Sequence, residues 1–400
     1  MPMNTWVTRF TFIAIAFTAI LHAAFEDELS SIEATPEEVV KPVYIKVLIS
    51  ENVDGTLLDV RGAYKVFNPE NQKLLSSGFR GKRYYLQTNK AGLKWGEGYP
   101  GVHQIKIVPS SPDSTVLVDG IQYKGNIETY DINAKIQIVN EVDVEDYLRS
   151  VLSQEFACEK HEPAVCDAIA IALRTHVYNT VAHSFNPYWD VRAKDVQYFG
   201  EAQTKINDAM EKAVLSTKGM IMTHKELPFS TTWTEHCGGK TASYEAIFRK
   251  KGDGPDGVLV GYAQKERADS RWKCTLNNSY LARLLNLEKV ESVDVYKDPV
   301  SKKVYAIRFN DKKQFNEMSI FEFQKLVGTS RILSTEFNVS LVKDDLFFEG
   351  YGKGSGVGIC LFTADQMAKN GTSMPQILAE FYPSTHIVKL SKLTESFKKD

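Results

Sequence analysis

The sequence has no excess of charge of either sign. Its 48 lysines and arginines nearly balance 50 aspartates and glutamates, which leaves a formal net charge of -2. Proteins that bind nucleic acid or an anionic membrane surface usually carry a clear basic excess. We therefore expect no nucleic-acid partner for this chain.

The sequence is also poor in cysteine. Five cysteines are too few for a dense disulfide scaffold, and an odd number leaves at least one thiol unpaired if all pairing is within the chain. They are Cys158, Cys166, Cys237, Cys274 and Cys360.

Cysteine and histidine lie close together at one place in the middle of the chain. Cys158, His161 and Cys166 form the pattern C-x2-H-x4-C, which His236 or Cys237 could complete as a zinc site. The spacing matches no strong zinc signature, so metal binding is left unassigned. Disulfides or buried thiols are the alternative, and they suit an exported protein.

A long hydrophobic run is absent except near the N-terminus. Residues 10–25 form an apolar stretch of sixteen residues, which is short of the roughly 20 that a spanning helix needs. Arg9 precedes this stretch, and small residues followed by acidic ones end it. We predict a signal peptide or an N-terminal anchor over 1–24 and a linker over 25–40. Both alternatives export the folded part, to the periplasm or cell envelope.

Alternating and β-branched segments dominate residues 41–140, and turn signals separate them. These segments are 43–50, 63–67, 103–108, 114–118, 123–132 and 135–139. The pattern predicts a β-rich N-terminal part.

The pattern changes to helical from residue 141 onward. Residues 143–155 read as a helix with Asp143 as its N-cap, and Pro163 opens a second helix that is apolar nearly all round. A third helix, within 204–219, is amphipathic and has Gly219 at its end. Its predicted apolar stripe is Ile206, Ala209, Met210, Ala213 and Val214.

The rest of the chain mixes both patterns. We predict a hairpin over 220–233, mixed elements over 275–350, and two terminal helices. The fold class is therefore α+β, with a region of mixed helix and sheet over 141–390 after the β-rich part and a tail over 391–400.

Glu155 is the first candidate for chemistry. Leu148, Leu152 and Glu155 share one face of the predicted helix, so the carboxyl loses hydration, which raises its pKa. A carboxyl near neutrality can protonate a leaving group and later take a proton back. Alternatively, the helix ends at Leu152 and Glu155 points to water.

Two further groups are candidates. Arg174 in the apolar helix needs an acidic partner or a bound anion, so it pairs with Glu155, holds a substrate carboxylate or forms a structural ion pair. In "EHCGGKT", Gly238 and Gly239 allow close backbone approach, and His236 with Cys237 could form a thiol or zinc hydrolase.

The glycine-rich run at 350–358 lacks the Lys-Ser/Thr ending of a phosphate-binding loop. We interpret it as close backbone packing around a groove, or as a tight turn.

Taken in order, these segments resemble the sporulation stage II protein D and LytB-type family of peptidoglycan-cleaving proteins. The stretches that carry the resemblance are 123–130, 138–156, 162–178, 195–200, 213–222, 235–241, 321–337, 350–371 and 377–387. Their common order along the chain is more specific than any one of them.

The resemblance implies a lytic transglycosylase that cleaves between N-acetylmuramic acid and N-acetylglucosamine. It further implies that the substrate is a glycan strand stripped of its stem peptides, so that an N-acetylmuramoyl-L-alanine amidase would be the functional partner. The resemblance implies no required cofactor. The family's catalytic glutamate falls on Glu155. One carboxyl would act as acid and then as base, while the sugar's own 6-hydroxyl attacks and leaves a 1,6-anhydro end.

The resemblance also implies a set of substrate-binding positions. These are Arg174, Gln197, Tyr198, His236, Gly238, Gly239 and Ser355. The chain departs from the family pattern at four places. Asp167, Ile169, Ser355 and the pair Cys360-Leu361 replace its polar residues. These departures keep a second reading open, a non-catalytic peptidoglycan-binding protein that regulates an amidase. Zinc, which some members hold, remains unassigned.

Overall fold

The computed structural model describes residues 43–89, 91–201 and 207–390. The segments expected over 1–24, 25–40 and 391–400 lie outside these residues. Within the described stretches, no helix combines the length and apolar character that crossing a membrane requires.

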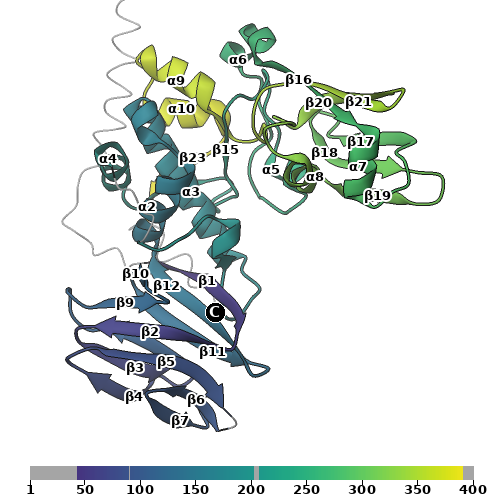
Figure 1. The fold of residues 1–400 in the computed structure, drawn as a ribbon. Coiled ribbons are helices and arrows are strands. Elements are labelled where there is room, and N and C mark those ends of the chain that lie inside the picture. Colours follow the sequence, from purple (N-terminus) through teal and green to yellow (C-terminus); the bar gives the residue numbers. More distant parts are fainter. Residues whose placement is uncertain (1–42, 90, 202–206, 391–400) are drawn as a thin grey trace, which may run out of the picture. The chain divides into compact units, whose positions relative to one another are not determined.

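The first hundred described residues, with the short strand β13 added from further along the chain, form two sheets that share one hydrophobic core (Figure 1). The seven-stranded sheet has the order β13-β1-β12-β11-β8-β3-β4, and the six-stranded sheet has the order β10-β9-β2-β5-β6-β7. The bounds in the first sheet are β1 Tyr44–Val53, β3 Tyr64–Asn68, β4 Lys73–Gly78, β8 Gln104–Pro109, β11 Asn126–Ile132, β12 Lys135–Asp143 and β13 Val191–Arg192. Those in the second are β2 Gly55–Arg61, β5 Lys82–Asn89, β6 Gly92–Trp95, β7 Glu97–Pro100, β9 Thr115–Val118 and β10 Ile121–Tyr123.

Alternating burial explains why these segments are strands. Leu58 and Val60 of β2, and Ile105 and Ile107 of β8, point into the core at a period of two. All six predicted segments contain a strand, so the β-rich N-terminal part is confirmed. The strands that escaped prediction include β5, where Leu86 is the one buried residue and the sequence shows no alternation.

A buried helix organises the next region. It is α3 (Pro163–Ala182), which contacts α2 (Val144–Glu155), α4 (Asp208–Ser216) and β14 (Met220–Thr223). Every residue from Ala168 to Ala172 is fully buried, as the apolar pattern predicted. Pro163 opens the helix, which is also as predicted.

The prediction for α4 needs two corrections. Met210, Ala213 and Val214 are buried, but Ala209 is exposed because it lies in the first turn, at the edge of the stripe. The helix ends at Ser216, and Gly219 makes a left-handed turn (φ 71°) three residues later. Ile206 lies outside the described residues.

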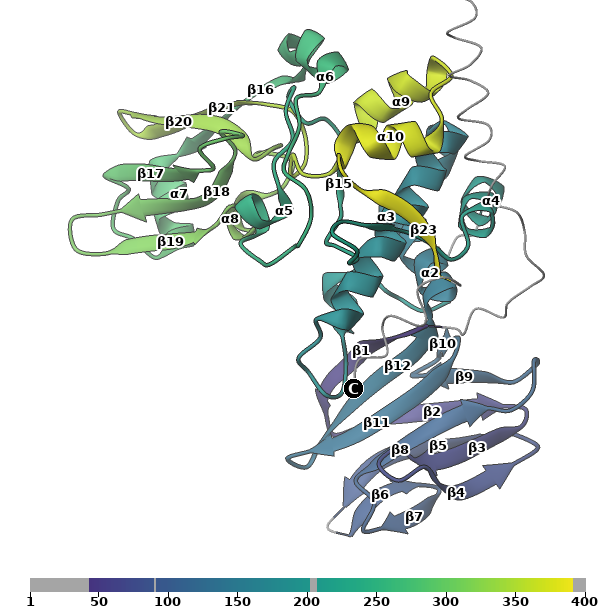
Figure 2. The same ribbon diagram turned by 180° about the vertical axis from the view of Figure 1, so that it is seen from behind.

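The predicted hairpin over 220–233 is wrong. β14 pairs instead with β23 (His386–Lys389) near the end of the described chain, and Figure 2 shows β23 running beside α3. A single bridge, His224 to Leu227, is all that forms of the hairpin. Pro228 follows immediately and has no N–H to donate to a second strand.

Residues 271–351 surround a second hydrophobic core. The bounds there are β16 Arg271–Asn277, α7 Asn278–Leu285, β17 Ser292–Lys297, β18 Val304–Asn310, β19 Phe315–Ser319, α8 Ile320–Val327, β20 Glu336–Val342 and β21 Asp345–Tyr351. The sheets are β16-β21-β20 and β17-β18-β19. The predicted mixed character of 275–350 is confirmed.

The chain then returns to the first core. β22 (Ile359–Cys360) pairs in parallel with β15 (Trp233–Thr234), and α9 (Leu361–Lys369) and α10 (Met374–Phe381) follow it. The elements not yet named are short: the 3₁₀ helices η1 Cys158–Lys160, η2 Ala193–Asp195 and η3 Arg267–Ser270, and the helices α5 Tyr244–Phe248 and α6 Gly261–Lys265. The α+β fold class is confirmed by this architecture.

Candidate functional site

Glu155 is the last residue of α2. Asp143 caps the start of this helix by accepting the Glu145 N–H at 2.8 Å. Leu148 and Leu152 are fully buried, and the helix ends when Phe156 adopts an extended conformation. The helix therefore does not end at Leu152, although Glu155 is exposed to solvent, as that alternative expected.

The Glu155 side chain is exposed, yet burial by the surrounding protein raises its pKa from 4.5 to about 7. No hydrogen bond or charged neighbour contributes to this rise. The side chain is therefore exposed and dehydrated at once, because solvent reaches the carboxyl on one side while protein atoms surround most of it. The result is a carboxyl that a ligand can reach and that is about half protonated near neutral pH.

The residues after Glu155 are fixed to distant parts of the chain. The Phe156 ring stacks on His161 at 4.7 Å and meets Trp233 of β15 edge-on at 6.1 Å. The His161 Nδ1 atom lies 2.7 Å from a carboxylate oxygen of Asp365 on α9. These contacts hold the C-terminal end of α2, and thus Glu155, against β15 and α9.

Arg174 is placed differently from the substrate-binding role expected for it. Its side chain is completely buried and forms a two-pronged ion pair with Glu145, at 2.9 and 2.7 Å. A third nitrogen donates to the Met220 carbonyl at 3.1 Å. The N–H donors of Arg174 are engaged and its side chain is not exposed. Arg174 therefore forms a structural ion pair with Glu145 that joins α2, α3 and β14. It contacts neither Glu155 nor a substrate surface.

Gln197 lies at the surface, whereas its neighbour Tyr198 lies in the core. The Gln197 side chain is exposed and its backbone is left-handed, with φ 49°. Tyr198 is buried, stacks on Tyr147 of α2 at 5.6 Å, and donates its hydroxyl to Asn140 at 2.6 Å. Tyr198 therefore supports α2 from inside, which removes it from direct substrate contact, while Gln197 stays available.

The turn at 236–239 carries the next three expected residues. The His236 Nδ1 atom accepts the Gly238 N–H at 3.0 Å, and burial lowers the pKa of His236. Gly238 and Gly239 both have positive φ, at 72° and 101°. A side chain at Gly239 would collide with Gln264, so the glycines allow close packing inside the protein rather than open a surface for a ligand.

Three charged residues that sequence reasoning missed hold this turn. The ammonium of Lys303 is buried and donates to the Cys237 carbonyl at 2.8 Å and to Glu336 at 3.0 Å. Arg267 donates to the Gly238 carbonyl and also pairs with Glu336. In the sequence these residues resemble ordinary strand-edge or loop charges, so no local signal marks them.

Ser355 lies in the glycine-rich segment, whose packing the structure explains. Its hydroxyl accepts the Val357 N–H at 3.3 Å, and its carbonyl accepts the Thr335 hydroxyl. A side chain at Gly358 would approach the Thr232 carbonyl to 1.9 Å, and one at Gly352 would approach that of His236 to 2.5 Å. The segment thus packs directly on residues 232–238, as the close-packing interpretation predicted.

The alternatives based on zinc or a thiol nucleophile find little support in this geometry. The described residues contain no group of three or more His, Cys, Asp or Glu side chains placed to hold a metal. His161 is engaged by Asp365 rather than turned toward His236. Cys237 is buried and its pKa is raised, by its contact with Cys360 and by burial, which makes it a poor nucleophile.

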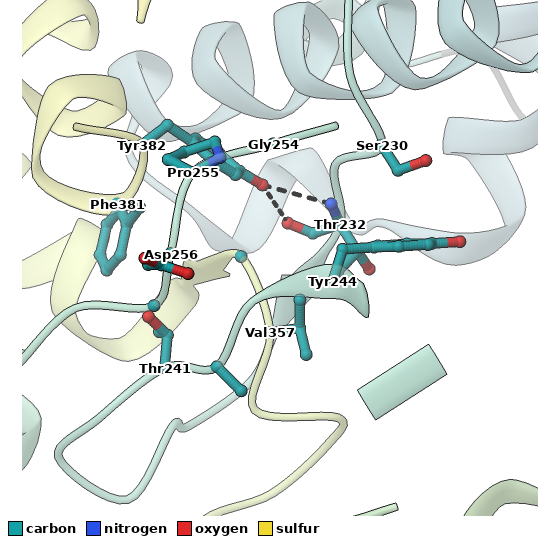
Figure 3. Close-up of a pocket in the computed structure, with 13 residues that line it drawn as sticks. Ser230, Thr232, Thr241, Tyr244, Gly254, Pro255, Asp256, Val357, Phe381 and Tyr382 are labelled. Carbon is teal, nitrogen blue, oxygen red and sulfur yellow. Dashed lines mark hydrogen bonds between the residues drawn. The ribbon is translucent and has the colours of Figure 1, made fainter. Parts of the chain in front are cut away.

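A small cavity lies between residues 230–232, the end of α10 and the loop at 254–257 (Figure 3). Its volume of about 10 Å³ has room for roughly one water molecule. Figure 3 shows the Tyr382 hydroxyl bonded to both the N–H and the carbonyl of Thr232, at 3.2 and 2.8 Å. The cavity is too small for a sugar ring, and Glu155 does not line it.

Comparisons with known proteins identify a family and several relatives of this chain. Residues 132–224 match the model of a family described as stage II sporulation protein, a span that includes Glu155. An uncharacterized protein of Brachyspira hyodysenteriae is 26% identical over 368 residues, or 89% of this chain and 96% of that relative. An uncharacterized protein of Chlamydia muridarum is 31% identical over 196 residues, or 48% of this chain and 68% of the relative. An uncharacterized protein of Chlamydia pneumoniae is 30% identical over 212 residues, or 52% of this chain and 76% of that relative.

Proposed function

Because this chain belongs to the stage II sporulation protein family, we propose that it cleaves the glycan strands of peptidoglycan as a lytic transglycosylase. The family assignment itself indicates a role related to the cell wall. The bond cleaved is that between N-acetylmuramic acid and N-acetylglucosamine, in strands that an amidase has stripped of stem peptides.

One observation carries the proposal: the reachable Glu155 carboxyl with a pKa raised to about 7. In its protonated form it donates to the glycosidic oxygen as the bond to the leaving sugar breaks. The resulting carboxylate then takes the proton of the muramic 6-hydroxyl as that oxygen attacks the anomeric carbon. The products are a free 4-hydroxyl on one strand and a 1,6-anhydro ring on the other.

The electrostatics of Glu155 suit a mechanism with one carboxyl. Glycosidases that use two carboxylates place them roughly 5–10 Å apart, and the charge of one raises the pKa of the other. Burial is the one cause of the raised pKa of Glu155, with no carboxylate contributing. A single group that serves first as acid and then as base needs no such partner.

A second candidate, a non-catalytic glycan-binding protein that regulates an amidase, draws on a different observation. Arg174 and Tyr198 are occupied inside the protein, and Ser355 replaces a polar residue of the family pattern. Fewer side chains than expected therefore remain to hold a glycan in position for cleavage.

The deciding experiment compares wild type with Glu155→Gln on amidase-treated sacculi. Glu380→Gln, which changes an exposed glutamate of α10, is the matched control. We expect anhydro-muramic ends from wild type and Glu380→Gln, and none from Glu155→Gln, with unchanged circular dichroism. Binding without any product from wild type would favour the non-catalytic protein. Ordinary reducing ends in place of anhydro-muramic ends would show that the protein is a hydrolase and not a transglycosylase.

A further inference from the structure

Four of the five cysteines gather as two pairs, although they are spread over more than two hundred residues of sequence. Cys158 with Cys166 is the first pair, and Cys237 with Cys360 is the second. All four side chains are at most 1% exposed and belong to the larger hydrophobic core. Cys274 is half-buried and belongs to the second core. All five carry free thiols in the structure.

The first pair joins the segment after Glu155 to the first turns of α3. The thiol of Cys166 donates to the Cys158 carbonyl oxygen at 3.3 Å, and the neighbouring Cys158 side chain together with burial raises the pKa of Cys166. Cys158 opens η1, and the turn that follows brings the side chain of Cys166, eight residues later, back to Cys158.

The second pair joins the turn at 236–239 to the start of α9. The Cys237 N–H donates to the Cys360 sulfur at 3.3 Å, across 123 residues of sequence. Cys360 is the N-cap of α9, and the Cys237 thiol together with the backbone N–H groups of Thr363 and Cys237 lowers the pKa of Cys360. Pairing of β15 with β22 brings the two cysteines together independently of any sulfur contact, since Thr234 is opposite Cys360.

We propose that each of these two pairs is oxidised to a disulfide bond in the mature protein, and that Cys274 remains the free thiol. Two bonds and one thiol account for the odd cysteine number. The pairing also follows from the fold, because each cysteine meets its partner within its own part of the core. The proposal depends on export only for the source of the oxidant.

Each bond forms by exchange with a small disulfide such as glutathione disulfide. One cysteine thiolate attacks a glutathione sulfur, and the first glutathione thiolate leaves and takes up a proton. The partner cysteine loses its proton and displaces the second glutathione. Two protein thiols are thus oxidised while one glutathione disulfide is reduced to two thiols. Since all four sulfurs are buried, exchange takes place on the folding chain, and the finished bonds resist reduction in the native state.

The two bonds would fix the surroundings of Glu155 from two directions. Cys158 is three residues beyond Glu155, so the first bond anchors the end of α2 to α3. The second bond anchors the turn at 236–239 to α9, whose Asp365 already holds His161. The second bond closes the much longer loop, so we expect it to contribute more to stability.

Peptide mapping without reductant tests the proposal on full-length wild-type protein refolded with glutathione disulfide. After alkylation in denaturant, we expect linked peptides for both pairs and alkylation of Cys274 alone. Cys274→Ser should leave both links and the melting temperature unchanged. Cys237→Ala/Cys360→Ala should lower the melting temperature and retain the first link.

Alkylation of all five cysteines, or links that cross between the pairs, would overturn the inference. So would stoichiometric zinc with four alkylated core cysteines, measured by metal analysis. These readouts do not depend on glycan cleavage, so an inactive protein with both links would reject the proposed function and retain the disulfides.

Discussion

The Glu155 carboxyl combines two properties that usually exclude each other. An exposed carboxylate normally has an ordinary pKa, and a carboxyl with a raised pKa is normally out of reach of a ligand. Glu155 is the last residue of α2, so its side chain is exposed while the surrounding protein still dehydrates the carboxyl. Rearrangement of this end should therefore abolish the raised pKa.

The first prediction at this scale is the pH dependence of cleavage. The acid form of Glu155 starts the reaction, so kcat/KM should be constant at low pH and fall about tenfold per pH unit once pH exceeds about 7. Release of anhydro-muramic ends from amidase-treated sacculi between pH 5 and 9 measures this profile. An apparent pKa near 4.5 would show that burial does not act on this carboxyl.

Arg174 supports a second prediction at the residue scale. Removing one partner of a buried ion pair leaves the other uncompensated, so Arg174→Met should lower the free energy of unfolding by about 3–5 kcal/mol. Arg149→Met is the control, because Arg149 pairs with the more exposed Glu211 and should cost about 1 kcal/mol or less. Urea unfolding measures both. Equal losses would contradict the assignment of Arg174 to the interior.

At the scale of elements, the glycine-rich segment and β15 behave as one unit. β22 continues the segment and pairs in parallel with β15, while Lys353 exchanges backbone hydrogen bonds with His236. A side chain at Gly352 or Gly358 would separate the two segments. The phosphate-loop likeness of the sequence is thus a consequence of packing, and the same glycines hold the turn at 236–239 in place.

Substitution of one of these glycines tests the packing. In Gly358→Ala the new methyl group would meet the Thr232 carbonyl at 1.9 Å in a left-handed conformation, and we expect a loss of at least about 3 kcal/mol. Gly371→Ala has a similar φ of 83° with no atom within 4 Å, so only the backbone strain of about 1 kcal/mol remains. Thermal unfolding monitored by circular dichroism compares the two. A milder effect at Gly358 than at Gly371 would argue against direct contact with β15.

The elements predicted well from sequence are those specified locally. Asp143 and Pro163 mark helix starts through their own chemistry, and the spacing from Leu148 and Leu152 predicts that Glu155 continues the same helix. Partners distant in sequence were not found. Arg174 could pair with any acid, and only the fold selects Glu145.

The same limit applies to strands and to the turn at 236–239. β14 has no local feature that selects β23 rather than a hairpin partner. Likewise, no sequence pattern around Lys303 predicts that its ammonium binds the Cys237 carbonyl. Sequence therefore indicated the acid of the candidate site, whereas its supporting contacts required the assembled molecule.

At the scale of the whole molecule, the described residues contain two large hydrophobic cores, and several hydrogen bonds connect their regions. Lys303 and Glu336 belong to the region of the second core and reach the turn at 236–239. Each core is large enough to unfold cooperatively on its own, and chains of this size commonly depart from two-state behaviour. We therefore expect urea unfolding in two steps.

Tryptophan fluorescence can assign the steps, since Trp95 is buried in the larger core and Trp272 in the second. In Trp272→Phe, the fluorescence change of one step should disappear, while circular dichroism still records both steps at nearly unchanged midpoints. Trp95→Phe should weaken the other step. Lys303→Met, which removes a link between the regions, should move the two midpoints further apart. A single transition that coincides by both probes in all variants would show instead that the two cores unfold as one unit.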